Sequence, residues 1–101
     1  MFEVQESDVF SRWLRGLRDR QGRRAILLRI QRMALGNMGD TKPVGRGVKE
    51  LRIFSGPGYR VYFVKLGTKV YLLLCGGDKS TQAKDIAKAK RLLADWSEEH
   101  G

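Results

Sequence analysis

The chain has 101 residues, which is enough for one hydrophobic core but not for two, so any function must reside in a single domain spanning residues 1–101. Hydrophobic residues make up 42% of the sequence and charged residues 31%, a balance that excludes a disordered tail and predicts a folded protein. The 20 Lys and Arg against 11 Asp and Glu give a net charge of +9, which indicates a polyanionic partner such as nucleic acid.

Two local features bear on where the protein works. The N-terminus carries Glu3 and Glu6 where a secretory signal needs basic residues, and no apolar run approaches the ~20 residues that span a bilayer. We therefore expect a cytoplasmic protein with no membrane partner. Cys75 is the single cysteine, so it cannot form an internal disulfide, and its apolar neighbours favour a place in the core.

The first third of the chain predicts a short strand and two helices. Phe2 to Gln5 alternates apolar and polar residues, and Ser7 with Asp8 supplies a cap for the helix that follows. Two apolar stripes then recur at helical spacing, Val9, Phe10, Trp13, Leu14 and Leu17 in the first and Ile26, Leu27, Ile30, Met33 and Ala34 in the second. An interruption near Gln21-Gly22 separates them, and Gly36-Asn37 ends the second. The pattern predicts a helical hairpin.

Arginine dominates the charge of this hairpin. Asp19 is the only acid in the stretch that holds Arg12, Arg15, Arg18, Arg20, Arg23, Arg24, Arg29 and Arg32. Arginine makes bidentate phosphate contacts and stacks on bases, so the cluster favours nucleic acid, although a solvated helix face explains many such runs. We select Arg15 and Arg23 as RNA-binding residues, each on an exposed helix face.

The rest of the chain predicts a β-meander and a last helix. Residues 36–47 predict a loop that presents Lys42 and Arg46 to solvent. Two strands, 48–54 and 59–66, flank the turn Ser55-Gly56-Pro57-Gly58, and a third, 69–75, is ended by Gly76-Gly77-Asp78. A helix follows from about Ser80 to Glu98. The order β-α-α-β-β-β-α predicts an α+β fold, with one antiparallel sheet and helices against one face.

Charged side chains meet on one face of the predicted hairpin. Alternation places Glu50 and Arg52 opposite Leu51 and Ile53, away from the helices. The five-residue connection predicts that Phe54 pairs with Arg60, which leaves Arg60 on the face of Glu50. The cationic face, with Lys79 from the following turn, suits RNA, and we add Lys42, Arg46, Tyr59 and Gln82 as RNA-binding residues.

Metal-free cleavage of RNA requires a base near the 2′-hydroxyl, cations on the phosphate and a proton donor for the 5′-oxygen. Glu50 fits the first role, Arg52 with Arg60 the second and Lys79 the third. The structural alternative for Glu50 is charge pairing with a neighbouring arginine. One cysteine and one histidine, His100 beside the terminus, give no ligand cluster, so we expect no metal and no cofactor.

The segment Gly76–Thr81 lies between a strand and a helix, where phosphate-binding loops occur. It does not match GxxxxGK[ST], because Leu73 and Asp78 occupy the glycine positions. Two interpretations remain: Lys79 and the first helix amides hold one phosphate, or the segment is an ordinary turn capped by Ser80 or Asp78.

Three motifs carry a family resemblance: Lys49-Glu50-Leu51-Arg52-Ile53, Gly56-Pro57-Gly58-Tyr59-Arg60-Val61-Tyr62-Phe63 and Leu74-Cys75-Gly76-Gly77-Asp78-Lys79-Ser80-Thr81-Gln82. With Gly36-Asn37 and Lys42-Pro43-Val44-Gly45, they closely resemble the RelE/ParE superfamily, in its HigB-like, phage Gp49-like addiction module killer branch. By position, Arg60 matches the arginine that stabilises the phosphate in the family, and Arg52 a basic residue of the preceding strand. Lys79 lies near a position where many members carry a terminal histidine or tyrosine, which this sequence lacks.

The resemblance implies the toxin of a type II toxin–antitoxin system, an endoribonuclease or mRNA interferase acting on mRNA at the translating ribosome. It also implies a cognate antitoxin with a helix-turn-helix domain. Charge favours the arginine-rich hairpin over the strand groove as the antitoxin surface. Two other functions stay open, a ParE-like inhibitor of DNA gyrase without nuclease activity and a non-catalytic nucleic-acid-binding module.

Overall fold

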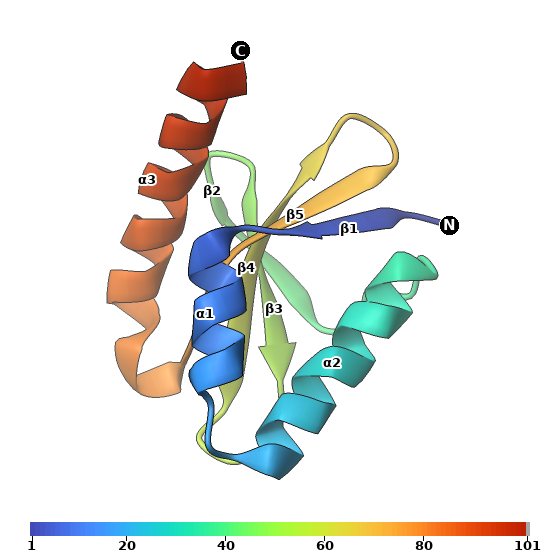
Figure 1. Cartoon of the computed structure of the whole chain (residues 1–101), viewed down its shortest axis with the longest axis vertical. Helices are drawn as coiled ribbons and strands as arrows, with labels where there is room; N and C mark the ends of the chain where they lie inside the picture. The colour runs from blue at the N-terminus through green and yellow to red at the C-terminus, as the bar shows by residue number, and fades with distance from the viewer. Residues whose placement is uncertain (101) are drawn as a thin grey trace.

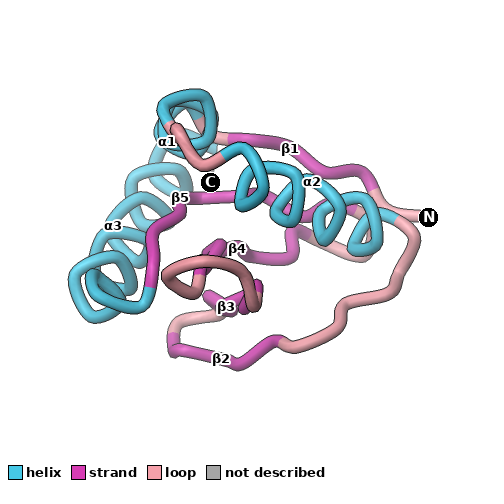
Figure 2. The backbone as a smooth tube through the Cα atoms, turned by 90° about the horizontal axis from the view of Figure 1, so that it is seen from below, coloured by secondary structure: helices cyan, strands magenta, loops and turns pink. Residues whose placement is uncertain are grey.

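Five strands form one mixed sheet in the computed structural model, which describes residues 1–100 (Figure 1). The strands are β1 Glu3–Glu6, β2 Thr41–Gly45, β3 Val48–Ile53, β4 Tyr59–Leu66 and β5 Val70–Asp78. Their order is β1-β5-β4-β3-β2 (Figure 2). The expected α+β class is confirmed. The sheet is not wholly antiparallel, because β1 pairs in parallel with β5 while the other neighbours are antiparallel.

Helices follow the expected pattern with shifted ends. They are α1 Asp8–Gly16, α2 Arg20–Ala34, the 3₁₀ turn η1 Lys79–Thr81 and α3 Gln82–His100. Ser7 caps α1, as expected, by accepting a hydrogen bond from the Phe10 amide at 3.0 Å. The break between the two helices falls before Asp19 rather than at Gln21-Gly22, since Asp19 caps α2 through the Gly22 amide at 3.0 Å. Among residues 1–100, no helix is long and apolar enough to cross a membrane.

Gly22 lies inside α2 for a packing reason. A Cβ atom at this position would stand 2.4 Å from Cε2 of Tyr59 and 2.7 Å from Oδ2 of Asp19. The side chain of Tyr59 therefore occupies the space that any larger residue would need. The glycine that suggested a helix break instead permits close contact between α2 and the sheet.

Both faces of the sheet are covered, which corrects the expectation of helices on one face only. On one face, α1 and α2 contribute Phe10 and Ile26 to a core that includes Leu51. On the other face, α3 contributes Ala89 to a second core that includes Tyr62. Strands β4 and β5 are apolar at successive positions, so both faces of these strands need cover.

Part of the expected 36–47 loop is an edge strand. Thr41–Gly45 forms β2, which pairs with β3 from Thr41 opposite Leu51 to Gly45 opposite Val48. Pro43 within it lacks an amide donor, which an edge strand tolerates and a central strand does not. Strand β5 also runs through the glycines expected to end it, to Asp78, and lies in the interior of the sheet as expected.

Candidate active site

Glu50 forms the centre of a buried polar cluster on the α3 side of the sheet. Its side chain is fully buried. One carboxylate oxygen, Oε2, accepts hydrogen bonds from the Tyr62 hydroxyl at 3.0 Å and from Nε2 of Gln82 at 2.7 Å. The other, Oε1, accepts from Nε of Arg52 at 3.1 Å. Both oxygens of this carboxylate therefore accept hydrogen bonds from the protein rather than from solvent.

Two arginines share this carboxylate. Arg52 and Arg60 are direct partners across β3 and β4, and Nε of Arg60 lies 3.8 Å from the same Oε1 atom that Arg52 contacts. Like charges directly opposite one another in a sheet are destabilising. Glu50 offsets that repulsion and holds the two guanidiniums side by side. The hairpin pairs Arg60 two residues earlier than expected, with Arg52 instead of Phe54, and a shift of two keeps every side chain on its predicted face.

The ionisation of Glu50 reflects two opposing effects. Burial raises the pKa of its carboxyl, whereas the hydrogen bonds of Gln82, Tyr62 and Arg52, with the nearby charge of Arg60, lower it further than burial raises it. The net pKa lies below the ordinary value, so Glu50 is a carboxylate at neutral pH. The Tyr62 hydroxyl has a raised pKa, because it is buried and donates to that carboxylate.

A hollow of about 420 Å³ opens beside this cluster. Its wall is the turn that joins β3 to β4, residues 54–58, and its charged lining comes from Arg60 and Lys79. The Arg60 side chain is nearly buried, and its Nη1 atom donates weakly to the carbonyls of Gly58 at 3.3 Å and Tyr59 at 3.4 Å. Lys79 is exposed. A nearly buried guanidinium and an exposed ammonium therefore line one concave surface.

The strand-to-helix segment is a turn capped by Asp78, which favours the second interpretation of Gly76–Thr81. The Asp78 carboxylate accepts a hydrogen bond from the Ser80 amide at 2.8 Å. The backbone amide of Asp78 donates to the Thr81 hydroxyl as part of a capping box. These helix amides are already hydrogen-bonded to Asp78, so the Lys79 side chain is the group in this turn that offers a positive charge to a ligand.

Gly77 lets the helix begin close to β5, because a Cβ atom at this position would stand 1.8 Å from Oδ2 of Asp85.

The chemistry available at this site is the binding of an anion. Arg60 and Lys79 line the hollow and Arg52 lies opposite Arg60 in the sheet, so their positive charges attract an anion such as a phosphodiester. No group of three or more His, Cys, Asp or Glu side chains that could hold a metal ion occurs in residues 1–100.

Comparison with known proteins assigns the chain to a family. The family model "Phage derived protein Gp49-like (DUF891)" matches residues 12–94, which includes Glu50, Arg52, Arg60 and Lys79. The chain belongs to this family. The Gp49-like proteins are the addiction module killer, RelE-like family, so the resemblance seen in the sequence motifs is confirmed. A protein of Haemophilus influenzae, described as uncharacterized, is 46% identical over 93 residues, covering 92% of this chain and 94% of the relative.

Three further residues expected in the Gp49-like site lie at different distances from it. Lys42 pairs directly with Glu50, so it occupies the site face of the sheet, and it is exposed. Gln82, the first residue of α3, bonds to Glu50 and supports the carboxylate from within the protein. Arg46 is exposed in the turn between β2 and β3, at the opposite end of β3 from the hollow.

Tyr59 and Arg23 do not fit the RNA-binding roles expected of them. Tyr59 is buried on the α2 side of the sheet, where its hydroxyl donates to Asp19 at 2.9 Å. Its place next to Arg60 in the chain turns it to the opposite face. Arg23 is half-buried and donates to the carbonyl of Leu17, so it joins the two helices instead of facing solvent.

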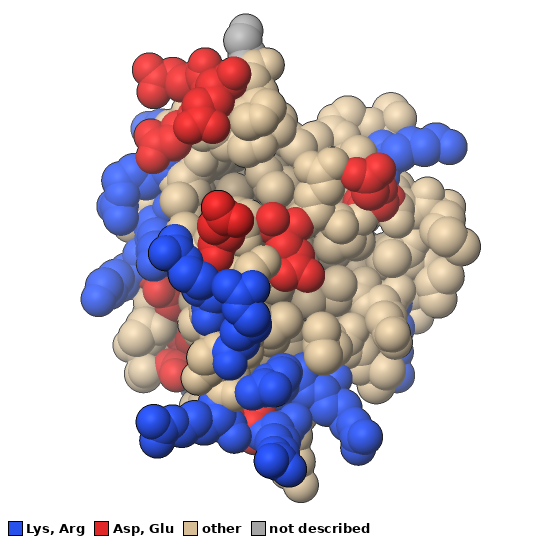
Figure 3. All heavy atoms as spheres, viewed as in Figure 1, with Lys and Arg blue, Asp and Glu red and all other residues tan. Residues whose placement is uncertain are grey.

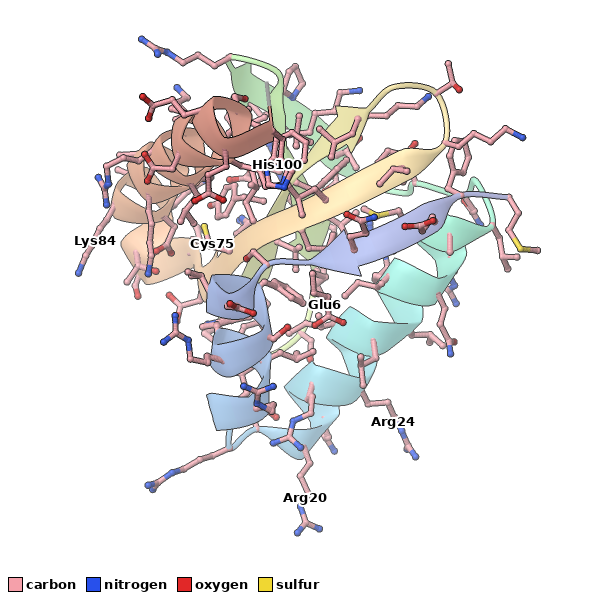
Figure 4. The ribbon with its side chains drawn as sticks, turned by 45° about the horizontal axis from the view of Figure 1, so that its top comes forward. Glu6, Arg20, Arg24, Cys75, Lys84 and His100 are labelled. Atoms are coloured by element: carbon pink, nitrogen blue, oxygen red, sulfur yellow. The ribbon has the colours of Figure 1, made fainter. Side chains whose placement is uncertain are left out.

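The remaining arginines of the hairpin do form an exposed surface. Figure 3 shows basic side chains gathered where α1 meets α2 and acidic ones over the C-terminal end of α3. The exposed arginines of α1, α2 and the segment between them are Arg12, Arg15, Arg18, Arg20 and Arg24. Arg20 and Arg24 point away from the body of the protein, whereas Cys75 lies within it (Figure 4). The expectation that Arg15 is exposed and Cys75 buried is confirmed.

Sequence reasoning missed Tyr62 as a member of the site. The signal was present, because Tyr62 and Arg60 are two residues apart in one strand and so share a face. Glu50 was expected to face a substrate as a general base. In the structure its side chain is fully buried and lies against Arg52 and Arg60, not against solvent.

Proposed function

We propose that this chain is the toxin of a type II toxin–antitoxin system and a metal-independent endoribonuclease that cleaves mRNA on the translating ribosome. The observation that carries the proposal is the pair of guanidiniums held by one buried carboxylate beside a concave surface that Lys79 also lines. Membership of the Gp49-like family, which is commonly toxin-like, supports the biological setting.

The cleavage that suits these residues is an attack within the RNA. The 2′-oxygen bonds to the adjacent phosphorus, its proton leaves to solvent, and the bond from phosphorus to the 5′-oxygen breaks. Arg60 and Arg52 stabilise the charge that develops on the phosphoryl oxygens, as preorganised donors do. Lys79 protonates the departing 5′-oxygen. The products are a 2′,3′-cyclic phosphate and a free 5′-hydroxyl.

The partner that we propose is a small antitoxin with a helix-turn-helix domain. The exposed arginines at the junction of α1 and α2 form a basic surface that an acidic partner segment would complement. Contact there would leave the hollow open and would block entry to the ribosome by bulk.

The decisive experiment is induced expression followed by primer extension on reporter transcripts, with and without their translation. We expect translated transcripts to be cut and Arg60→Ala to lower cleavage by roughly 100-fold or more, as loss of one transition-state donor does. Lys69→Ala removes an exposed cation from the turn between β4 and β5 and serves as the matched control. Intact transcripts together with gyrase-dependent DNA breaks would contradict the proposal.

A further inference from the structure

One aromatic side chain next to the hollow is exposed. Phe54 is 79% exposed, and the other Phe, Tyr and Trp side chains of residues 1–100 are buried or half-buried. A ring this exposed buries little apolar surface, so it adds little to the stability of the fold. We propose that Phe54 is a stacking platform for a base of single-stranded RNA, an inference that rests on the proposed ribonuclease function.

Hydrogen bonds hold the backbone on both sides of this ring. The Ser55 amide donates to the carbonyl of Ile53 at 3.0 Å, which closes a three-residue turn centred on Phe54. The Gly58 amide donates to the carbonyl of Ser55, also at 3.0 Å, and closes the next turn. Arg29 of α2 donates to the carbonyl of Arg52 and holds the end of β3. A platform held at both sides loses little freedom when it binds.

Phe54 also lines two hollows that contain cationic side chains. It lines the hollow of about 420 Å³ that contains Arg60 and Lys79. It lines a second hollow of about 250 Å³, which contains Arg32 on the outer side of α2. A strand with its reacting phosphate at Arg60 can place the neighbouring base on the ring and the next phosphate toward Arg32.

This arrangement matches how proteins hold single strands without selecting a sequence. Aromatic rings accept the π-face of any base, while cations on either side follow the backbone. We therefore assign the Phe54 surface to RNA.

The test measures binding without cleavage. The probe is a 2′-O-methyl RNA of about eight nucleotides that carries 2-aminopurine, a base whose fluorescence falls on stacking; the modified 2′-oxygen cannot attack. We expect Phe54→Leu to weaken binding at least about fivefold and to abolish the quenching, because it keeps an apolar side chain but removes the aromatic face. Phe54→Trp should retain both. Leu35→Ala, at a residue 68% exposed that lines neither hollow, is the matched control and should change neither.

The outcomes separate this inference from the proposed function. If Phe54→Leu binds and quenches as the wild type does while the wild type cleaves mRNA, the stacking role is overturned alone. If the wild type quenches through Phe54 but leaves mRNA intact, the proposed function fails and the RNA surface stands. If Phe54→Leu changes only capture of a protein partner, the ring serves that partner and the inference is wrong.

Discussion

Replacing Glu50 by glutamine removes the one negative charge that two guanidiniums share. Removing one partner of a buried ion pair typically costs about 3–5 kcal/mol, because the remaining charge loses its compensation. The Arg52 side chain is 30% exposed and that of Arg60 is 10% exposed, so water screens Arg52 more than Arg60. The glutamine oxygen can still accept from Tyr62. We expect Glu50→Gln to lower the free energy of unfolding by about 2–4 kcal/mol at neutral pH.

The pH dependence of this loss follows from the lowered pKa of Glu50. A carboxyl with a lower pKa in the folded state stabilises the fold above its ordinary value, 4.5, where it is ionised. That contribution disappears as the pH falls through the folded pKa. Urea unfolding should therefore show a large difference between wild type and Glu50→Gln at about pH 7 and a smaller one at about pH 3.

Glu98→Gln provides the control for this experiment, since Glu98 is an exposed carboxylate on α3. Its effect should stay within about 0.5 kcal/mol. A loss of that small size for Glu50→Gln, or a loss equal at both pH values, would refute the assignment of Glu50 as the shared counter-charge.

Three further predictions concern packing, the thiol and the basic surface. Gly22→Ala should lower the free energy of unfolding in urea by about 1–3 kcal/mol through its clash with Tyr59, whereas Gly16→Ala, with nothing within 4 Å, should be neutral or stabilising. Cys75, whose pKa burial raises to about 12, should resist an aromatic disulfide reagent at about pH 8 until the protein unfolds; fast reaction in the folded protein would contradict its burial. Arg15→Glu should weaken RNA binding and flatten its salt dependence without lowering thermal stability, and an unchanged salt slope would exclude this surface from RNA contact.

Local sequence signals predicted much of the fold because they depend on near neighbours. The helical hairpin followed from apolar spacing, and alternation in β3 placed Leu51 and Ile53 in the core with Glu50 and Arg52 on the other face. The hairpin register was wrong by two residues, yet Arg60 was correctly grouped with Glu50, since faces repeat every second residue.

Features that depend on distant partners were not predicted. Edge strand β2 has a proline and a glycine in five residues, so its only strong signal is its pairing with β3. The burial of Glu50 requires α3 to lie over the same face, and its bond to Gln82 joins residues 32 positions apart. The alternation of residues along a strand assigns each side chain to a face of the sheet. Whether that face is exposed to solvent depends on the helix that packs against it.

We propose that the cluster around Glu50 serves function rather than stability. A sheet that needed only stability would favour well-packed apolar residues, because exchanging a buried ionic group for them is often neutral or stabilising by about 1–4 kcal/mol. A variant combining Glu50→Leu, Arg52→Met, Arg60→Met and Tyr62→Phe removes the charges and the buried hydroxyl together, and half-buried Gln82 can turn to water. We expect its free energy of unfolding to equal or exceed that of the wild type, while cleavage is lost. If it is instead less stable than Glu50→Gln alone, the charged cluster holds the fold together, and its arginines need no functional explanation.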